Sequence, residues 1–327
     1  MGSLFPCLPD EIGWQCLARE QLSSHHTLRC VCKSWNAALK NSHFYEERKR
    51  LKSSEQRICV VQYIEEIGYR VAVYDPEKNS CKSLAPIPAE IDGFPDCYFM
   101  KQKLVLITDM FDDSTGICVW LYDFPCSKWR QGAKTPLDFG GEFASAVDED
   151  GGLIYIGGGF GRASVYNVEE DKWDVLPDMN THMQCFTGAF ADGKFYVMGI
   201  SFRSFEVFDS YTRSWTTMEN RFNNWHCFET TFGHLHYLYV RGLIEHDYSQ
   251  AKVNIVGTFP MEYWGRIIDF AGLVSNKIFV GFYYPFEAEG FYMLSPPSET
   301  GGTCKLIGIE RPSGLQGFVI SAATLDL

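Results

Sequence analysis

The sequence predicts a mostly β protein, in which a closed six-bladed β-propeller of residues 58–327 follows a small all-α domain of residues 1–50 and a linker of residues 51–57. Two observations lead to this prediction. From residue 58 onward, a strand that ends in an aromatic residue recurs six times at the period of a four-stranded blade. Before that point, apolar residues recur at helical spacing.

The first fifty residues predict several short helices. Leu8-Pro9-Asp10-Glu11 indicates a helix start, because proline suits the first turn and acidic groups there complement the helix dipole. Ser23 and Ser24 can cap a second helix, the apolar spacing continues to Leu39, and a fourth helix is expected near Ser42. Helices of this size bury too little apolar surface to be robust alone, which favours burial against another protein.

Three segments of this region, Leu8–Glu11, Cys16–Arg19 and Leu28–Trp35, resemble an F-box, which docks on the Skp-type adaptor of SCF ligases. The resemblance implies binding to that adaptor and, through it, to cullin and RING subunits. The residues assigned to form or support the adaptor-binding face are Leu8, Pro9, Ile12, Cys16, Leu17, Val31, Cys32 and Trp35. Similar plant proteins have Val-Pro where this chain has Glu20-Gln21, a difference in the first turn between helices. The alternative is that these helices merely cap the larger domain.

The repeat that begins at residue 58 has a recognisable marker. Each copy contains a strand that ends in an aromatic residue, then a polar turn and often a tryptophan. The aromatic positions of the clear copies are Tyr74, Tyr122, Tyr166 and Phe208, which are 48, 44 and 42 residues apart, and weaker copies lie at 245–247 and 291–293. This period predicts six blades of four strands each.

An apolar run precedes each marker, as in Leu104–Ile107, Leu153–Ile156 and Lys194–Val197. Continuous apolar runs are expected for strands buried on both faces, so these are predicted to be inner strands. Gly157–Gly159 and Gly199 follow two of them. With the later tryptophans, these glycines make the pattern similar to the kelch repeat, which implies a kelch-type propeller.

The C-terminal segment Phe318–Ala323 is predicted to close the ring. The first copy, Ile58–Leu84, lacks the strand that precedes the apolar run in other copies, such as Phe143–Val147. The C-terminal segment supplies such a strand with no copy after it. Pairing the two would remove both free sheet edges.

Aromatic and arginine residues recur in loops expected on one face of the propeller. Arg162 and Arg203 each lie seven residues beyond the tyrosine of an inner strand. Aromatic side chains supply rigid apolar area and arginine pairs with acidic groups, a combination typical of protein-binding sites. The candidate target-binding residues are Phe160, Arg162, Phe202, Arg203, Trp225, His226, Arg241, Trp264, Arg266 and Tyr283. For each, the alternative is packing between blades.

Over nearly its whole length the sequence resembles plant F-box/kelch-repeat proteins, including the segments Phe44–Arg50 and Val73–Lys78. The resemblance implies the substrate-recognition subunit of an SCF E3 ubiquitin ligase, which binds a target protein for ubiquitination and proteasomal degradation. It implies no catalytic residues, metal or cofactor of its own. Relatives direct phenylpropanoid enzymes, such as phenylalanine ammonia-lyase, or cytokinin-response regulators to degradation, and both kinds of target stay open here.

Two other functions stay open at this point. Propellers of this type also carry enzymes, and His234 and His236 would point the same way from one strand, where they could ligate a metal. No third ligand is suggested nearby, and acidic pairs such as Asp112-Asp113 are usually solvated. A scaffold outside a ligase is the second alternative.

Charge and composition narrow the partners further. Residues 1–57 carry nine Lys or Arg and six Asp or Glu, a balance of +3, whereas the remainder carries 20 and 35, a balance of −15. An acidic body repels phosphate, so nucleic acid is not expected as a ligand. No apolar stretch is long enough to cross a membrane, and the 12 cysteines lack metal or disulfide spacing. We therefore expect a cytoplasmic or nuclear protein.

Overall fold

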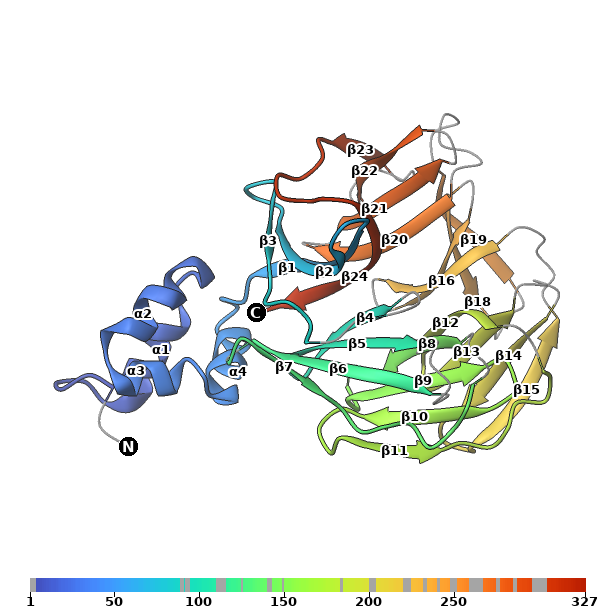
Figure 1. The fold of residues 1–327 in the computed structure, drawn as a ribbon, viewed down its shortest axis with the longest axis horizontal. Helices are drawn as coiled ribbons and strands as arrows, with labels where there is room; N and C mark the ends of the chain where they lie inside the picture. Colours follow the sequence, from blue (N-terminus) through green and yellow to red (C-terminus); the bar gives the residue numbers. More distant parts are fainter. Residues whose placement is uncertain are drawn as a thin grey trace.

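A group of helices lies at one side of a set of β-sheets, next to the start of the first strand (Figure 1). The computed structural model describes residues 4–88, 91, 95–109, 116–124, 126–139, 143–148, 150–182, 185–199, 204–219, 225–231, 234–239, 242–247, 252–258, 267–274, 277–284, 287–295 and 305–327. Within this part of the chain, no helix has the length and apolar character needed to cross a membrane.

The helices follow the sequence expectation closely. They are α1 (Asp10–Ala18), the short 3-10 helix η1 (Leu22–Ser24), α2 (His25–Val31), α3 (Lys33–Ala38) and α4 (Ser42–Arg50). Pro9 precedes α1, and the first turn carries two acidic residues, as predicted. Ser24 precedes α2 without a capping hydrogen bond from its side chain, because residues 22–24 already form η1. Asn41 instead caps α4, accepting a hydrogen bond from the His43 backbone.

The strands form four-stranded antiparallel sheets. Sheet A consists of β24 (Phe318–Asp326), β1 (Gln56–Ile64), β2 (Gly68–Asp75) and β3 (Ser80–Ser83), in that order. Sheet B consists of β4 (Asp96–Met100), β5 (Lys103–Asp109), β6 (Ile117–Asp123) and β7 (Lys128–Gln131). Sheet C consists of β8 (Phe143–Asp148), β9 (Leu153–Gly158), β10 (Ala163–Asn167) and β11 (Lys172–Val175). Sheet D consists of β12 (Cys185–Ala191), β13 (Lys194–Gly199), β14 (Ser204–Asp209) and β15 (Ser214–Glu219).

Two further sheets are described through the pairing of their strands. Sheet E consists of β16 (Trp225–Thr231), β17 (His234–Tyr239), β18 (Gly242–Asp247) and β19 (Lys252–Thr258). Sheet F consists of β20 (Ile267–Val274), β21 (Lys277–Tyr284), β22 (Glu287–Ser295) and β23 (Lys305–Ile309). The mostly β prediction is confirmed, and the arrangement fits a propeller-like fold.

The first strand of each sheet meets its counterparts in neighbouring sheets. β24 contacts both β4 and β20, β12 contacts both β8 and β16, and β16 contacts β20. The Tyr98 hydroxyl lies 2.8 Å from that of Ser145, which links β4 to β8. The apolar runs predicted as inner strands are the second strands of their sheets, β5, β9, β13, β17 and β21. The side chains of β5, β9 and β13 are mostly buried, which accounts for the apolar composition of these three strands.

The C-terminal strand pairs with the first strand of the repeat, as predicted. β24 runs antiparallel to β1 from the pair Gln56–Asp326 to the pair Tyr63–Phe318. Beyond the strands, the backbones of Glu55 and Leu327 exchange hydrogen bonds of 2.8 and 3.2 Å. Sheet A is therefore built from two segments far apart in the chain, and β1 is paired on both of its edges.

The repeated tryptophans join consecutive sheets. Each indole N–H donates a hydrogen bond to a carbonyl oxygen in the connection that arrives from the preceding sheet: Trp129 to Ala85 at 2.7 Å, Trp173 to Ala133 at 2.8 Å and Trp215 to Pro177 at 2.7 Å. The ring of each also packs on the aromatic marker of its own sheet, at 4.9 Å between Trp173 and Tyr166. The sequence repeat thus corresponds to a repeated fastening between sheets.

We expect Trp173→Phe to lower the free energy of unfolding by about 1–2 kcal/mol, because the variant keeps a ring against Tyr166 but loses the hydrogen bond to Ala133. Urea unfolding followed by circular dichroism measures the change. Tyr211→Phe is the control, since Tyr211 is 85% exposed. Removal of its hydroxyl group should change the free energy of unfolding by less than about 0.5 kcal/mol. Equal stability of the two variants would contradict the fastening role.

Candidate functional site

An exposed apolar surface lies on the helices where the sequence predicts adaptor binding. Leu8, Ile12 and Val31 are 43%, 43% and 57% exposed. Pro9, Cys16 and Cys32 are exposed as well. Large apolar side chains gathered in this way usually mark a protein-binding surface.

The two other predicted residues lie beneath this surface. Leu17 is only 2% exposed and belongs to a core shared by the helices and sheets A and B. Trp35 is half-buried, its indole N–H donates to the Leu4 carbonyl at 2.8 Å, and its ring lies 5.0 Å from that of Phe5. Both side chains therefore support the exposed surface from below.

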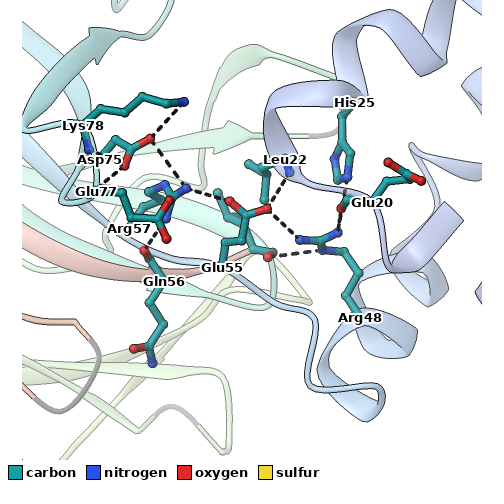
Figure 2. A network of polar contacts seen from close by, with 11 residues as sticks. Glu20, Leu22, His25, Arg48, Glu55, Gln56, Arg57, Asp75, Glu77 and Lys78 are labelled. Carbon is teal, nitrogen blue, oxygen red and sulfur yellow. Dashed lines mark hydrogen bonds and ion pairs between the residues drawn. The ribbon is translucent and has the colours of Figure 1, made fainter.

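A buried arginine joins the helices to sheet A (Figure 2). Arg48 of α4 is 0% exposed. Its guanidinium donates to the carbonyl oxygens of Ala18 at 3.0 Å and of Glu20, and its Nε donates to the carbonyl oxygen of Leu327 at 3.3 Å. One side chain thereby connects the end of α1, the following turn, α4 and the residue after β24.

Glu55 supplies the negative charge opposite Arg48. Its Oε1 lies 3.4 Å from Arg48 Nη2 and accepts a hydrogen bond of 2.6 Å from the Leu22 backbone. Its Oε2 lies 2.6 Å from Arg57, whose guanidinium is also 3.6 Å from Asp75 of β2. Charges therefore alternate from the helices into sheet A, and burial of the guanidinium is compensated by fixed acceptors.

His25 completes the surroundings of Arg48. Its Nε2 lies 3.4 Å from Arg48 Nη1. Burial, with the nearby guanidinium as second cause, lowers the pKa of His25 from 6.5 to about 4. The neutral imidazole can therefore accept a hydrogen bond from Arg48 at physiological pH. Arg48 cannot be singled out from the sequence, because Glu46–Arg50 has the composition of a solvated charge run.

Each sheet has two ends that differ in their connections. The near end carries the start of β1, where the helices attach. The far end carries the turn between the second and third strands and the connection to the next sheet. Phe160 and Arg162 lie in the β9–β10 turn, at the far end, and both are exposed. Within the described part of the chain, Arg162 makes no ion pair, so its guanidinium is available to a partner.

Neighbouring connections hold the β9–β10 turn in place. The Gly159 backbone donates to the Phe139 carbonyl at 3.0 Å, and the Met179 backbone donates to the Gly161 carbonyl at 2.6 Å. Gly161 has φ +75°, a conformation that favours glycine, and lies against the exposed His182. The structure thus presents Phe160 and Arg162 on a braced turn.

The other predicted target-binding residues are placed only in part. Trp225 and His226 begin β16 and Tyr283 lies near the end of β21, so their backbones are at the far ends of sheets E and F. Phe202, Arg203, Arg241, Trp264 and Arg266 lie outside the described residues.

A half-buried carboxylate lies apart from these surfaces. Asp96 begins β4 and accepts a hydrogen bond from the Ser145 hydroxyl of β8. Burial raises the pKa of Asp96 to about 6. His234 and His236 lie in β17, as the metal alternative requires. Among the described residues, no group of three or more His, Cys, Asp or Glu is arranged to hold a metal ion.

We expect Arg48→Ala to lower the free energy of unfolding by about 3–5 kcal/mol, because it removes the buried hydrogen bonds to Ala18, Glu20 and Leu327 and the ion pair with Glu55. Arg48→Lys should lie between the wild type and the alanine variant, since a lysine keeps the charge but cannot make all the hydrogen bonds. Urea unfolding gives these values. Arg50→Ala is the control, because Arg50 is exposed and pairs only with Glu47, and a similar loss in that variant would contradict the role of Arg48.

His25 predicts a dependence of stability on pH. Because the pKa of His25 is about 4 in the folded protein and 6.5 in the unfolded chain, the unfolded chain binds a proton at a higher pH than the folded protein does. The stability from neutral His25 is complete above pH 6.5 and should fall by about 3 kcal/mol as the pH drops to 4. The raised pKa of Asp96 changes stability with pH in the opposite direction. The pH profile of stability is therefore compared with that of His25→Gln, whose side chain can still accept a hydrogen bond from Arg48. Identical pH profiles of the two proteins would contradict this prediction.

The comparisons with known proteins agree with the helical and repeat patterns. Residues 5–47 match the F-box domain. One F-box/kelch-repeat protein of Arabidopsis thaliana is 30% identical over 217 residues, which cover 60% of this chain and 61% of the relative. A second is 28% identical over 221 residues (60% and 62%), and F-box/kelch-repeat protein SKIP30 is 27% identical over 236 residues (66% and 66%). The chain thus spans 61–66% of the length of these relatives. It carries an F-box domain and is similar to plant F-box/kelch-repeat proteins, as the resemblance in its sequence predicts.

Proposed function

We propose that this protein is the substrate-recognition subunit of an SCF ubiquitin ligase. The observation that carries the proposal is the separation of two exposed surfaces. Leu8, Ile12 and Val31 lie on the helices, within the segment that matches the F-box, while Phe160 and Arg162 lie at the far end of sheet C. The first surface would bind the Skp-type adaptor and the second a target protein.

The sheets would be the blades of a six-bladed kelch-type propeller. In this proposal residues 1–50 form the F-box domain, residues 51–57 the linker and residues 58–327 the propeller, closed by β24. The support comes from the four-stranded sheets, the contacts between their first strands and the pairing of β24 with β1. Closure between the two chain ends is the usual way in which a ring of sheets avoids exposed edges.

No bond is made or broken by the receptor in this scheme. It holds the target so that lysines of the target meet a ubiquitin-charged enzyme at a high effective concentration. The buried contacts of Arg48 would fix the direction in which the target is presented, because they tie α1 and α4 to sheet A.

The target surface combines an aromatic side chain with a cation, so we propose that part of the target is acidic. A phenylpropanoid enzyme or a response regulator, the two kinds of target that the resemblance implies, would be met in the cytoplasm or nucleus. A scaffold function outside a ligase would use the same surfaces but would not bring a cullin with it.

We expect Leu8→Glu and Ile12→Glu each to weaken adaptor binding at least about tenfold, because a buried unpaired carboxylate at an interface costs more than about 1.4 kcal/mol. Calorimetric titration of the purified chain with a Skp-type adaptor, followed by cullin pull-down, measures the effect. Val175→Glu is the matched control, since Val175 is 47% exposed but lies on β11. If the wild type does not bind the adaptor, or all three variants bind it equally, the proposed function is wrong.

A further inference from the structure

Exposed apolar side chains gather at the far end of sheet A as well. Outside the helices, the large apolar side chains described as exposed are Tyr63, Ile67, Phe160, Val175, Tyr211 and Phe318. Tyr63, Ile67 and Phe318 all lie where β1 ends, β2 begins and β24 begins. Tyr211 lies in the β14–β15 turn, at the near end. The sequence analysis did not single out any of the three residues on sheet A.

Three aromatic residues form a ladder across this end of the sheet. Tyr63 of β1 pairs in register with Tyr69 of β2 on one side and with Phe318 of β24 on the other. The rings of Tyr63 and Tyr69 are 5.2 Å apart. Tyr63 is 38% exposed and Phe318 57% exposed, and Ile67 in the adjoining turn is 66% exposed. Paired residues on neighbouring strands share one face, so the three aromatic residues lie on the same face of sheet A.

The backbone beside the ladder is fixed. Gly317 has φ +62°, and a Cβ atom there would collide with the carbonyl oxygen of Tyr63. Only glycine therefore lets the chain before β24 approach β1 so closely. The Arg311 guanidinium donates to the Gly317 carbonyl at 2.5 Å and holds the same segment. The position of Phe318 is thus set before any partner binds.

Two acidic residues lie beside the ladder. Glu65 and Glu66 are exposed in the β1–β2 turn, next to Ile67. Two cations of the same region, Arg70 and Arg311, are directed to Gln316 and to backbone carbonyl oxygens. The turn beside Ile67 therefore carries the charge opposite to that of the turn carrying Arg162.

We propose that the ladder of Phe318, Tyr63 and Tyr69, with Ile67 and the acidic turn beside it, is a second docking subsite for a target segment that carries lysine or arginine next to an aliphatic side chain. The inference rests on the proposed function and specifies the partner. An aliphatic side chain buries apolar area on the rings, a cation is attracted to aromatic faces and to Glu65 and Glu66, and an acidic segment is repelled. The same target would present an acidic segment to Arg162.

The test uses the full-length protein and an array of immobilised twelve-residue peptides of four compositions: lysine with leucine, glutamate with leucine, lysine with serine, and leucine with serine. We expect strongest binding to the lysine–leucine peptides. Ile67→Ser and Phe318→Ser should each reduce this signal about tenfold, the loss typical of an interface anchor, while Tyr211→Ser should not. The double variant Glu65→Lys, Glu66→Lys should shift the preference toward the glutamate–leucine peptides. Circular dichroism checks that each variant is folded.

The outcomes separate this inference from the proposed function. If lysine–leucine peptides bind no better than the others, or bind equally to the Ile67 and Phe318 variants, the subsite does not exist, even when adaptor titration succeeds. If these variants instead convert a dimer to a monomer in light scattering, the ladder is a contact between two copies and the inference is overturned. Arg162→Glu should reduce only the signal of the glutamate–leucine peptides. If this reduction is not seen and the protein does not bind the adaptor, the proposed function is wrong, and that result says nothing against the subsite on sheet A.

Discussion

The structure depends on a charged side chain that is removed completely from water. A buried guanidinium is costly unless its donors meet fixed acceptors, and Arg48 meets carbonyl groups from α1, from the following turn and from the residue after β24, together with the Glu55 carboxylate. The hydrogen bond from Arg48 to Leu327 joins two segments that are separated by 279 positions in the chain. The helices are short and cannot be stable alone, so this contact also explains how they keep their positions.

Local signals in the sequence predicted most of the elements. Pro9 with two acidic residues marked the start of α1, and the aromatic markers located β2, β6, β10 and β14. The pairing of β24 with β1 followed from an unpaired pattern at each end of the repeat. The strand that precedes each apolar run was also expected from the sequence, and β8 before β9 is an example.

The sites were less predictable, because exposure depends on packing. Leu8 and Leu17 are the same type of residue, yet Leu8 is 43% exposed and Leu17 only 2% exposed. Arg48 is surrounded in the sequence by Glu46, Lys49 and Arg50, which are exposed, so only the fold reveals that Arg48 is buried. The aromatic ladder was missed since Tyr63, Tyr69 and Phe318 come from three strands, and alternation along each strand alone predicts an ordinary blade. That Phe160 and Arg162 lie close together could be predicted, because both belong to one short turn, while their part in target binding stays a prediction.

The two ends of the sheets are therefore unequal in a way that suits a receptor. At the near end, apolar side chains of the helices and of sheets A and B pack into a common core. The hydrogen bonds of Arg48 fix the orientation of the helices on that core. At the far end, aromatic side chains remain exposed, with Glu65 and Glu66 in the turn of sheet A and Arg162 in the turn of sheet C. In the proposed receptor, two modest contacts of opposite charge, held at a fixed separation by the sheets, would select a target by orientation as well as by composition. Because the helices are tied to sheet A, they would carry that orientation to the adaptor.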